Sequence, residues 1–181
     1  TAIDQDEQPG RCNIEKIPTL KPAFKKDGTI TAAASSSIND GAAALVLASA
    51  AKAQALGAKP LARVLAHATH AQSPEWFTTA PVGAIQKVLD KAGWTVDSVD
   101  LFEVNEAFAV VAMAPMRELG LPHSKLNIHG GACALGHPIG ASGARLLVTL
   151  LNALAQTGGK RGVAALCIGG GEATAVAVEL A

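Results

Sequence analysis

Three segments of the sequence hold side chains that can do chemistry, and each lies beside glycine or at the end of a predicted strand. Asn105 follows a predicted strand, and its amide can fix a water or a substrate oxygen. His137 lies in residues 129–143, where five residues are glycine, and its imidazole can move a proton near neutral pH. Cys167 ends an apolar run, and residues 169–171 after it are glycines whose N–H groups can form an oxyanion hole.

Each of these three residues also has an ordinary structural interpretation. Asn is among the best helix-capping residues, so Asn105 can simply begin the helix predicted over residues 106–119. A lone histidine is more often a satisfied core or surface residue than a catalyst, although the glycines around His137 favour a functional loop. A free cysteine such as Cys167 is usually a small buried side chain. The residues taken one by one therefore leave catalytic and structural roles open.

The glycines do not fit the nucleotide-binding or hydrolase patterns. Residues 131–136 have the spacing of a P-loop, but His137 stands where that loop needs Lys. Residues 169–174 lack the last glycine of a dinucleotide fingerprint and lead into a predicted strand rather than a helix. Residues 140–144 (GASGA) miss the Gly-x-Ser-x-Gly elbow of hydrolases by one residue. None of these three site classes is expected.

Strands and helices alternate along the chain, which predicts an α/β fold. Two strands, 163–168 and 173–180, are predicted to form a hairpin, which makes the sheet mixed. Pro115 should bend the helix 106–119 or mark its break. The apolar run 41–48 fits either a strand or a helix. The other predicted elements are helices over 49–56, 81–92 and 144–156 and strands over 61–68 and 100–104.

Composition excludes several classes of protein. The 181 residues suffice for one domain, and 15 basic residues balance 15 acidic ones, which argues against nucleic-acid and membrane-surface partners. The longest uncharged apolar stretch, around residues 42–51, is shorter than the ~20 residues of a membrane span. Three cysteines form no paired motif, so we expect free thiols, a reducing compartment such as the cytoplasm, and no zinc at His129, Cys133 and His137.

Taken together, the three segments resemble the thiolase family. The stretches NEAF (105–108), GGACALGHPIGASG (130–143) and CIGGGEA (167–173) match the three sequence signatures of the carboxyl-terminal part of thiolases. Residues 20–43 are similar to the thiolase stretch beside the coenzyme A site. The resemblance covers nearly the whole chain.

The resemblance implies a role for each of eight residues. His137 is expected to activate the nucleophilic cysteine and to help hold a thioester oxygen. Cys167 is expected to move a proton at the α-carbon of the acyl-CoA, for which its thiol pKa must be lowered by nearby cationic or dipolar groups. Asn105 would fix a water in the first oxyanion hole, and the N–H of Gly169 would belong to the second. Residues Ser36, Phe24 and Ala32 fall where thiolases touch the pantetheine arm, and Phe108 lies near the acyl group.

The resemblance also implies an architecture. The fold would be a layered α-β-α arrangement with a mixed five-stranded sheet. Residues 1–38 would end the thiolase loop region, residues 39–60 would be a strand–helix piece of the amino-terminal domain, and residues 61–181 would form the carboxyl-terminal domain. Thiolases carry the acyl group on a cysteine in their amino-terminal half, and Cys12 and Cys133 do not match that motif. The chain is therefore expected to lack the acyl-carrying cysteine.

The implied activity is that of an acetyl-CoA C-acetyltransferase or a related 3-ketoacyl-CoA thiolase. Such an enzyme joins two acyl-CoA molecules or splits a 3-ketoacyl-CoA with coenzyme A, through a covalent acyl-enzyme. No metal or redox cofactor is expected, and the expected partners are acyl-CoA, coenzyme A, the missing amino-terminal half, and further copies in a homodimer or homotetramer. The alternative is that the chain is an inactive carboxyl-terminal fragment or domain that serves only assembly or interaction.

Overall fold

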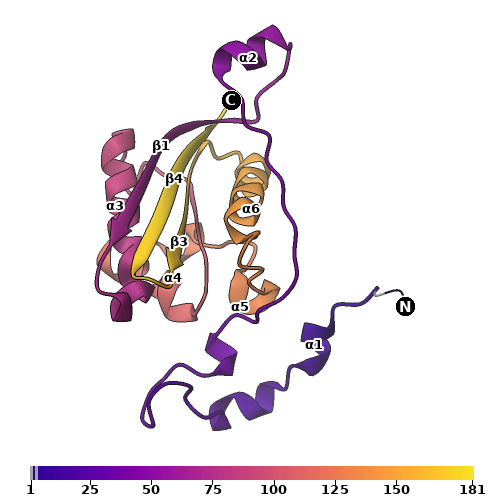
Figure 1. Cartoon of the computed structure of the whole chain (residues 1–181), viewed down its shortest axis with the longest axis vertical. Coiled ribbons are helices and arrows are strands. Elements are labelled where there is room, and N and C mark those ends of the chain that lie inside the picture. The colour runs from indigo at the N-terminus through magenta and orange to yellow at the C-terminus, as the bar shows by residue number, and fades with distance from the viewer. Residues whose placement is uncertain (1, 3) are drawn as a thin grey trace.

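A computed structural model of the chain describes residue 2 and residues 4–181, and a mixed sheet lies at its centre (Figure 1). The strand order is β1-β4-β3-β2. The strands are β1 (Ala62–Ala71), β2 (Leu101–Val104), β3 (Arg161–Ile168) and β4 (Glu172–Leu180). Strand β4 is antiparallel to both β1 and β3, whereas β2 runs parallel to β3. The predicted α/β class, the mixed sheet and the final hairpin are confirmed.

The described sheet has four strands, so the expected number of five is wrong. Beyond β2, the only pairing in the described part of the chain is an isolated parallel bridge between Phe102 and Leu126. The short η4 (His123–Lys125) precedes Leu126, and Asn127 adopts a positive φ of 48°. The chain is thus extended beside β2 for a single residue before it turns away, which is too short for a strand.

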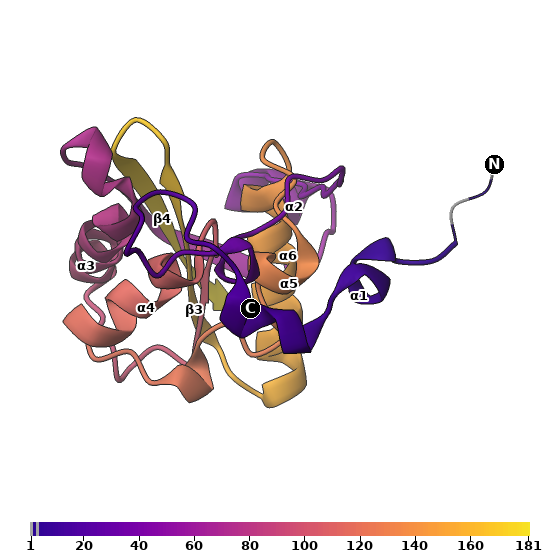
Figure 2. The same cartoon turned by 90° about the horizontal axis from the view of Figure 1, so that it is seen from below.

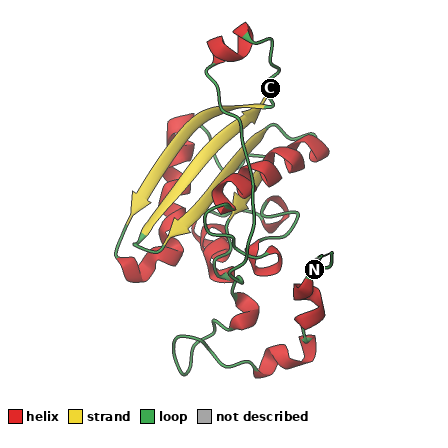
Figure 3. Cartoon of the chain, turned by 45° about the vertical axis from the view of Figure 1, so that its right-hand side comes forward, coloured by secondary structure: helices red, strands yellow, loops and turns green. Residues whose placement is uncertain are grey.

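Helices cover both faces of the sheet, as Figure 3 shows. On one face lie α3 (Ala80–Ala92) and α4 (Ala109–Glu118), and on the other lies α6 (Ser142–Thr157). Two apolar cores result, a larger one under α3 and α4 and a smaller one under α6. The expected α-β-α layering is confirmed, and within the described chain no helix is long and apolar enough to cross a membrane.

Apolar spacing and glycine stops explain the two longest helices. The buried residues of α6, among them Leu146, Leu150 and Leu154, recur at helical spacing and face the sheet. Helix α6 ends at Gly158, which has the left-handed φ of 73° that ends many helices. Helix α3 ends in the same way at Gly93, with a φ of 67°. These features are readable in the sequence, which is why both helices were predicted within two residues.

Helix α4 starts later than the predicted helix 106–119 and continues through Pro115. It begins at Ala109 with Phe108 as the flanking residue, so Asn105 is not its cap. Residues 105–107 are not helical, and Phe108 is extended and forms a bridge with Ser35. Pro115 lies inside the helix, which continues to Glu118, so the proline does not mark its break.

The amino-terminal third of the chain lies largely outside the layered part, as Figure 2 shows for α1. Its short helices are α1 (Glu7–Arg11), η1 (Ile14–Thr19), η2 (Ala32–Ala34) and α2 (Ala50–Ala55). The apolar run 41–48 forms neither a strand nor a helix, and Val46 and Leu47 are 98% and 81% exposed. The remaining short helices are η3 (Pro74–Thr79) and α5 (Ala132–Leu135).

Candidate active site

The carboxyl end of β2 is fixed by a neighbouring amide. The side chain of Asn127 accepts a hydrogen bond from the N–H of Val104 (2.8 Å) and donates one to the carbonyl oxygen of Val104 (2.9 Å), as a paired strand would. The N–H of Asn105 donates to the carbonyl oxygen of Ala165 on β3 (2.9 Å). Asn105 is 1% exposed, so its backbone and side chain are held in place at the end of the strand.

His137 lies between Asn105 and Ser142. Its Nδ1 is 2.6 Å from the hydroxyl oxygen of Ser142, the first residue of α6, and its Nε2 is 3.4 Å from Nδ2 of Asn105. The hydroxyl of Ser142 donates its own proton to the carbonyl oxygen of Pro138 (3.1 Å). Nδ1 must therefore carry the proton that Ser142 accepts, which leaves Nε2 as an acceptor for the amide of Asn105.

The surroundings of His137 favour its neutral form. Burial lowers the pKa of the imidazole below its ordinary value of 6.5, and the positive charge of Arg145 lowers it further. Near pH 7 the ring is then a neutral base whose lone pair is on Nε2, where it faces the amide of Asn105. The backbone N–H of His137 donates to the carbonyl oxygen of Ser37 (2.8 Å), so the residue is held through its main chain as well.

Glu106 organises the glycine-rich loop beside this histidine. Its carboxylate accepts hydrogen bonds from Nδ2 of Asn127 (2.8 Å) and from the N–H of Cys133 (3.2 Å). A side chain at Gly131 would overlap that carboxylate, which explains a glycine at this position. Burial and the neighbouring Glu106 raise the pKa of Cys133 to about 11, so this thiol stays protonated. The predicted packing role of Cys133 agrees with these contacts.

Cys167 lies at the same edge of the sheet as Asn105, because β2 and β3 run parallel and both end there. It is half-buried and pairs with Ala173 across the hairpin. Burial raises the pKa of the Cys167 thiol. The lowered pKa that a resting thiolate requires is thus not produced by the described surroundings. Gly169 follows in the hairpin turn, and a side chain there would meet open space.

The residues expected near coenzyme A lie beside the NEAF segment. The rings of Phe24 and Phe108 meet edge to face at 5.4 Å between centroids, and Phe77 lies 6.4 Å from Phe108. Both the N–H and the hydroxyl of Ser36 donate to the carbonyl oxygen of Ala107 (3.1 Å each). The structure therefore brings Phe24, Ser36 and Phe108 together.

Ala32 lies four residues before Ser36 in the chain. It begins η2, and its carbonyl oxygen accepts a hydrogen bond from the N–H of Ser35 (3.3 Å). It is thus placed at the start of the same short segment, with its side chain exposed.

Sequence reasoning missed three residues of this site: Ser142, Glu106 and Arg145. Ser142 was considered only as part of a failed hydrolase motif, although its place five residues after His137 in a glycine-rich stretch was the available signal. Glu106 and Arg145 gave no local signal, because their partners lie 27 and 42 residues away in the sequence. In the described part of the chain, no three His, Cys, Asp or Glu side chains gather as metal ligands.

Comparison with known proteins agrees with this arrangement. The family model for the thiolase C-terminal domain matches residues 58–180, and the model for the thiolase N-terminal domain matches residues 1–51. The chain belongs to the thiolase family. Among solved thiolases, the acetyl-CoA acetyltransferase of Bacillus anthracis superposes with a TM-score of 0.89 at 44% identity, over 92% of this chain and 42% of that one.

Two other relatives place the chain within the thiolases. An acetyl-CoA acetyltransferase of Pseudomonas aeruginosa is 51% identical over 96% of this chain and 44% of its own length. A thiolase of Ascaris suum, solved in complex with coenzyme A, has a TM-score of 0.88 at 43% identity, over 99% of this chain and 47% of that one. The chain thus spans less than half the length of the thiolases that it matches.

Proposed function

We propose that the protein to which this chain belongs is an acetyl-CoA C-acetyltransferase or a related 3-ketoacyl-CoA thiolase. It would condense two acyl-CoA molecules into a 3-ketoacyl-CoA and free coenzyme A, or run the reverse thiolysis. The observation that carries the proposal is His137, held at both ring nitrogens beside the carboxyl end of β2. Relatives named as acetyl-CoA acetyltransferases, of which this chain spans less than half, support the same reaction.

The tautomer of His137 suits the first half of the reaction. Its unprotonated Nε2 would take the proton of the acyl-accepting thiol, which we place outside this chain. Nε2 would then carry a proton that it can donate to a thioester oxygen. The amide of Asn105 would hold a water against the same oxygen, and its Oδ1, which has no partner within the described chain, is free to bind that water.

The protonated thiol of Cys167 suits the thiolysis direction. When the carbon–carbon bond of a 3-ketoacyl-CoA breaks, the electron pair goes to the α-carbon of the departing acetyl-CoA, which must gain a proton. Cys167 would donate that proton, and the N–H of Gly169 would stabilise the enolate oxygen. In the condensation direction the Cys167 thiolate would remove the same proton. A reducing compartment such as the cytoplasm would keep this thiol free.

Binding of coenzyme A would use the aromatic and hydroxyl groups beside residues 105–108. We place the pantetheine arm against Phe24, Ala32 and Ser36, and the acyl group near Phe108. The close packing of Phe24 on Phe108 supports one continuous surface. We also propose that residues 1–38 belong to the thiolase loop region, 39–60 to the amino-terminal domain and 61–181 to the carboxyl-terminal domain.

A second candidate role is assembly without turnover by this chain alone. The exposed apolar residues Ile38, Val46 and Leu47 favour it, because such a run is usually covered by another domain or chain. The missing amino-terminal half and a further copy in a homodimer or homotetramer are the proposed partners.

The deciding experiment is a thiolysis assay with acetoacetyl-CoA and coenzyme A. It is run on this chain and on the longest protein that carries it. We expect turnover only in the longer protein, and loss of α-proton exchange from acetyl-CoA in its Cys167→Ala variant. Turnover that survives unchanged in this variant would contradict the role of Cys167. A longer protein that binds acetoacetyl-CoA without turnover would favour the assembly role.

A further inference from the structure

The most deeply buried polar side chains among the described residues come from β2, from the residue after it and from the first turn of α6. Glu103, Asn105 and Ser142 are each 1% exposed, and no other polar or charged residue among those described is as deeply buried. Asn105 and Ser142 hold His137. Glu103 does not touch the histidine, and the proposed reaction gives it no part. A carboxylate is costly to bury, so its burial needs an explanation.

Glu103 is paired with Arg145, and the two come from the same elements as the residues that hold His137. Glu103 and Asn105 lie two residues apart along β2 and its end, so they point to the same face of the sheet. Ser142 and Arg145 lie three residues apart on α6, so they share a face of the helix. Two links therefore join β2 to the first turn of α6: one through His137, and one through Nη1 of Arg145 and Oε2 of Glu103 (3.5 Å).

The contacts of this pair are poor for a pair that serves stability alone. Only one oxygen and one nitrogen meet, and Oε1 of Glu103 and Nη2 of Arg145 are buried without a partner in the described chain. Burial raises the pKa of Glu103 to about 7, against the attraction of Arg145. A buried ion pair with incomplete hydrogen bonding is often no more stable than apolar residues of similar size. The role of this ion pair is then better explained by the residues that it positions than by a gain in stability.

We propose that Glu103 and Arg145 are a positioning pair for His137. The pair fixes the spacing between the end of β2 and the start of α6 at which Asn105 and Ser142 each reach one ring nitrogen. It also places the guanidinium of Arg145 close enough to the imidazole to disfavour a proton on Nε2. The consequence for catalysis rests on the proposed function, whereas the effect on the imidazole does not.

The charged groups around His137 fix the sign of the expected changes. Arg145 on α6 is the cation that lowers the pKa of His137. Glu103 lies behind Arg145 on β2, and Glu106, after the end of β2, adds a second carboxylate that raises the pKa of Glu103. Removing the charge of Arg145 should therefore raise the pKa of His137. Removing the charge of Glu103 should lower it, because Arg145 is then uncompensated.

The test is NMR of the histidine rings in this chain, which needs no turnover. The chain has five histidines, and H137Q assigns the signal of His137. Long-range nitrogen–proton spectra report the pKa and the tautomer in the wild type, R145Q, R145K and E103Q. We expect a raised pKa and a mixed tautomer in R145Q, a lowered pKa in E103Q, and a pKa near that of the wild type in R145K, which keeps the charge.

The matched control is E179Q, which breaks two ion pairs, with Arg63 and Arg161, at the opposite end of the same sheet. It should leave the His137 signal unchanged. A pKa and tautomer of His137 that are the same in R145Q and E103Q as in the wild type would overturn the proposal, even if both variants unfold more easily. If R145Q does not fold, E103Q carries the same test through its lowered His137 pKa. Absence of thiolysis in the longer protein would overturn the proposed function but leave this result standing.

Discussion

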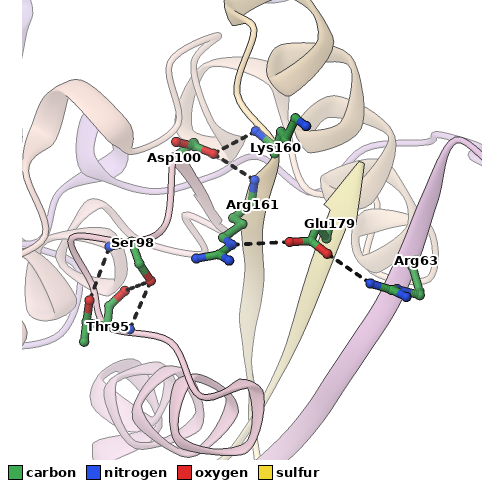
Figure 4. A network of polar contacts seen from close by, with 7 residues as sticks. All are labelled: Arg63, Thr95, Ser98, Asp100, Lys160, Arg161 and Glu179. Carbon is green, nitrogen blue, oxygen red and sulfur yellow. Dashed lines mark hydrogen bonds and ion pairs between the residues drawn. The ribbon is translucent and has the colours of Figure 1, made fainter. Parts of the chain in front are cut away.

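Strands β2 and β3 run parallel, and the polar groups at their amino ends differ in burial and in hydrogen bonding from those at their carboxyl ends. At the amino ends, Figure 4 shows a network near the surface in which the carboxylates of Asp100 and Glu179 each meet two partners. One oxygen of Asp100 accepts hydrogen bonds from the N–H groups of Lys160 (2.7 Å) and Arg161 (2.8 Å). Glu179 pairs with Arg161 (3.3 Å) and Arg63 (3.1 Å). This end fixes the strand register with well-satisfied groups.

At the carboxyl ends the polar groups are buried, and several lack partners. Asn105, Glu103 and Arg145 each have one side-chain atom without a hydrogen bond in the described chain. Such groups are costly to folding, and the unpaired Oδ1 of Asn105 is available to a water or a substrate. The comparison teaches that one strand pair can keep its stabilising contacts at one end and its reactive groups at the other.

We expect the largest effect from a change at the carboxyl ends of β2 and β3, where it should alter the rate of the reaction rather than stability. Replacing His137 with Ala in the longest protein that carries this chain should slow acyl transfer by about 10²–10⁴-fold, the usual contribution of a positioned acid–base group. Thermal unfolding should change little, since the half-buried ring leaves the apolar cores intact. Thiolysis rates and melting curves of the same samples check this. A rate within threefold of the wild type would remove His137 from the reaction.

The next effect separates the packing of α6 from its polar contacts. Leu150 is fully buried between α6 and the sheet, with its side chain against Gly162. Leu150→Ala should lower the free energy of unfolding by about 2–5 kcal/mol, because it leaves a cavity. Urea unfolding measures this, and Val148→Ala, at a 42% exposed position on the same helix, is the control. Equal losses in both variants would mean that α6 is not anchored through this core.

A smaller effect is expected at the amino end, and it should depend on pH. Burial alone would raise the pKa of Asp100, but backbone hydrogen bonds from Arg161 and Lys160, together with the charges of Lys125 and Arg161, hold it below its ordinary 3.8. A lowered folded pKa stabilises the fold above the unfolded pKa, and this stabilisation is lost as pH falls through the folded value. Asp100→Asn should therefore lower the free energy of unfolding at pH 6 by about 1 kcal/mol. The variant should also lose less of its free energy of unfolding than the wild type when the pH is taken below 4. Urea unfolding at several pH values tests this, and parallel curves for the two proteins would contradict it.

The smallest effect should be that of Glu179→Gln. Hydrogen bonds from Arg161 and then Arg63 lower the pKa of Glu179, but an exposed pair is screened by solvent and contributes little. We expect the same melting temperature as the wild type in moderate salt. A clear loss of stability that persists in high salt would show that the amino end depends on this carboxylate more than exposed charges usually allow.

The features that the sequence predicted are those with local signals. Helices α3 and α6 follow from apolar spacing and terminal glycines, and Asn105, His137 and Cys167 stood out beside glycines or at strand ends. The start of α4 could not be predicted in the same way. Residues 105–108 stay outside the helix, where Ser35 bridges Phe108 and Ser36 donates to the carbonyl oxygen of Ala107, 71 residues away. The link between Glu103 and Arg145 likewise depends on how α6 lies on the sheet, which no local pattern encodes.

The hydrogen bond between Ser37 and His137 has a mechanical consequence. This bond attaches the loop that carries the histidine to residues 36–41, which precede the layered part of the chain. The side-chain amide of Asn39 also donates to the carbonyl oxygen of Leu135 in the same loop (3.4 Å). A side chain at Gly136 would overlap the side chain of Asn39, so the two segments are closely packed at this point. A displacement of residues 36–41 relative to the sheet would therefore reach the backbone of His137 directly, without passing through the apolar cores.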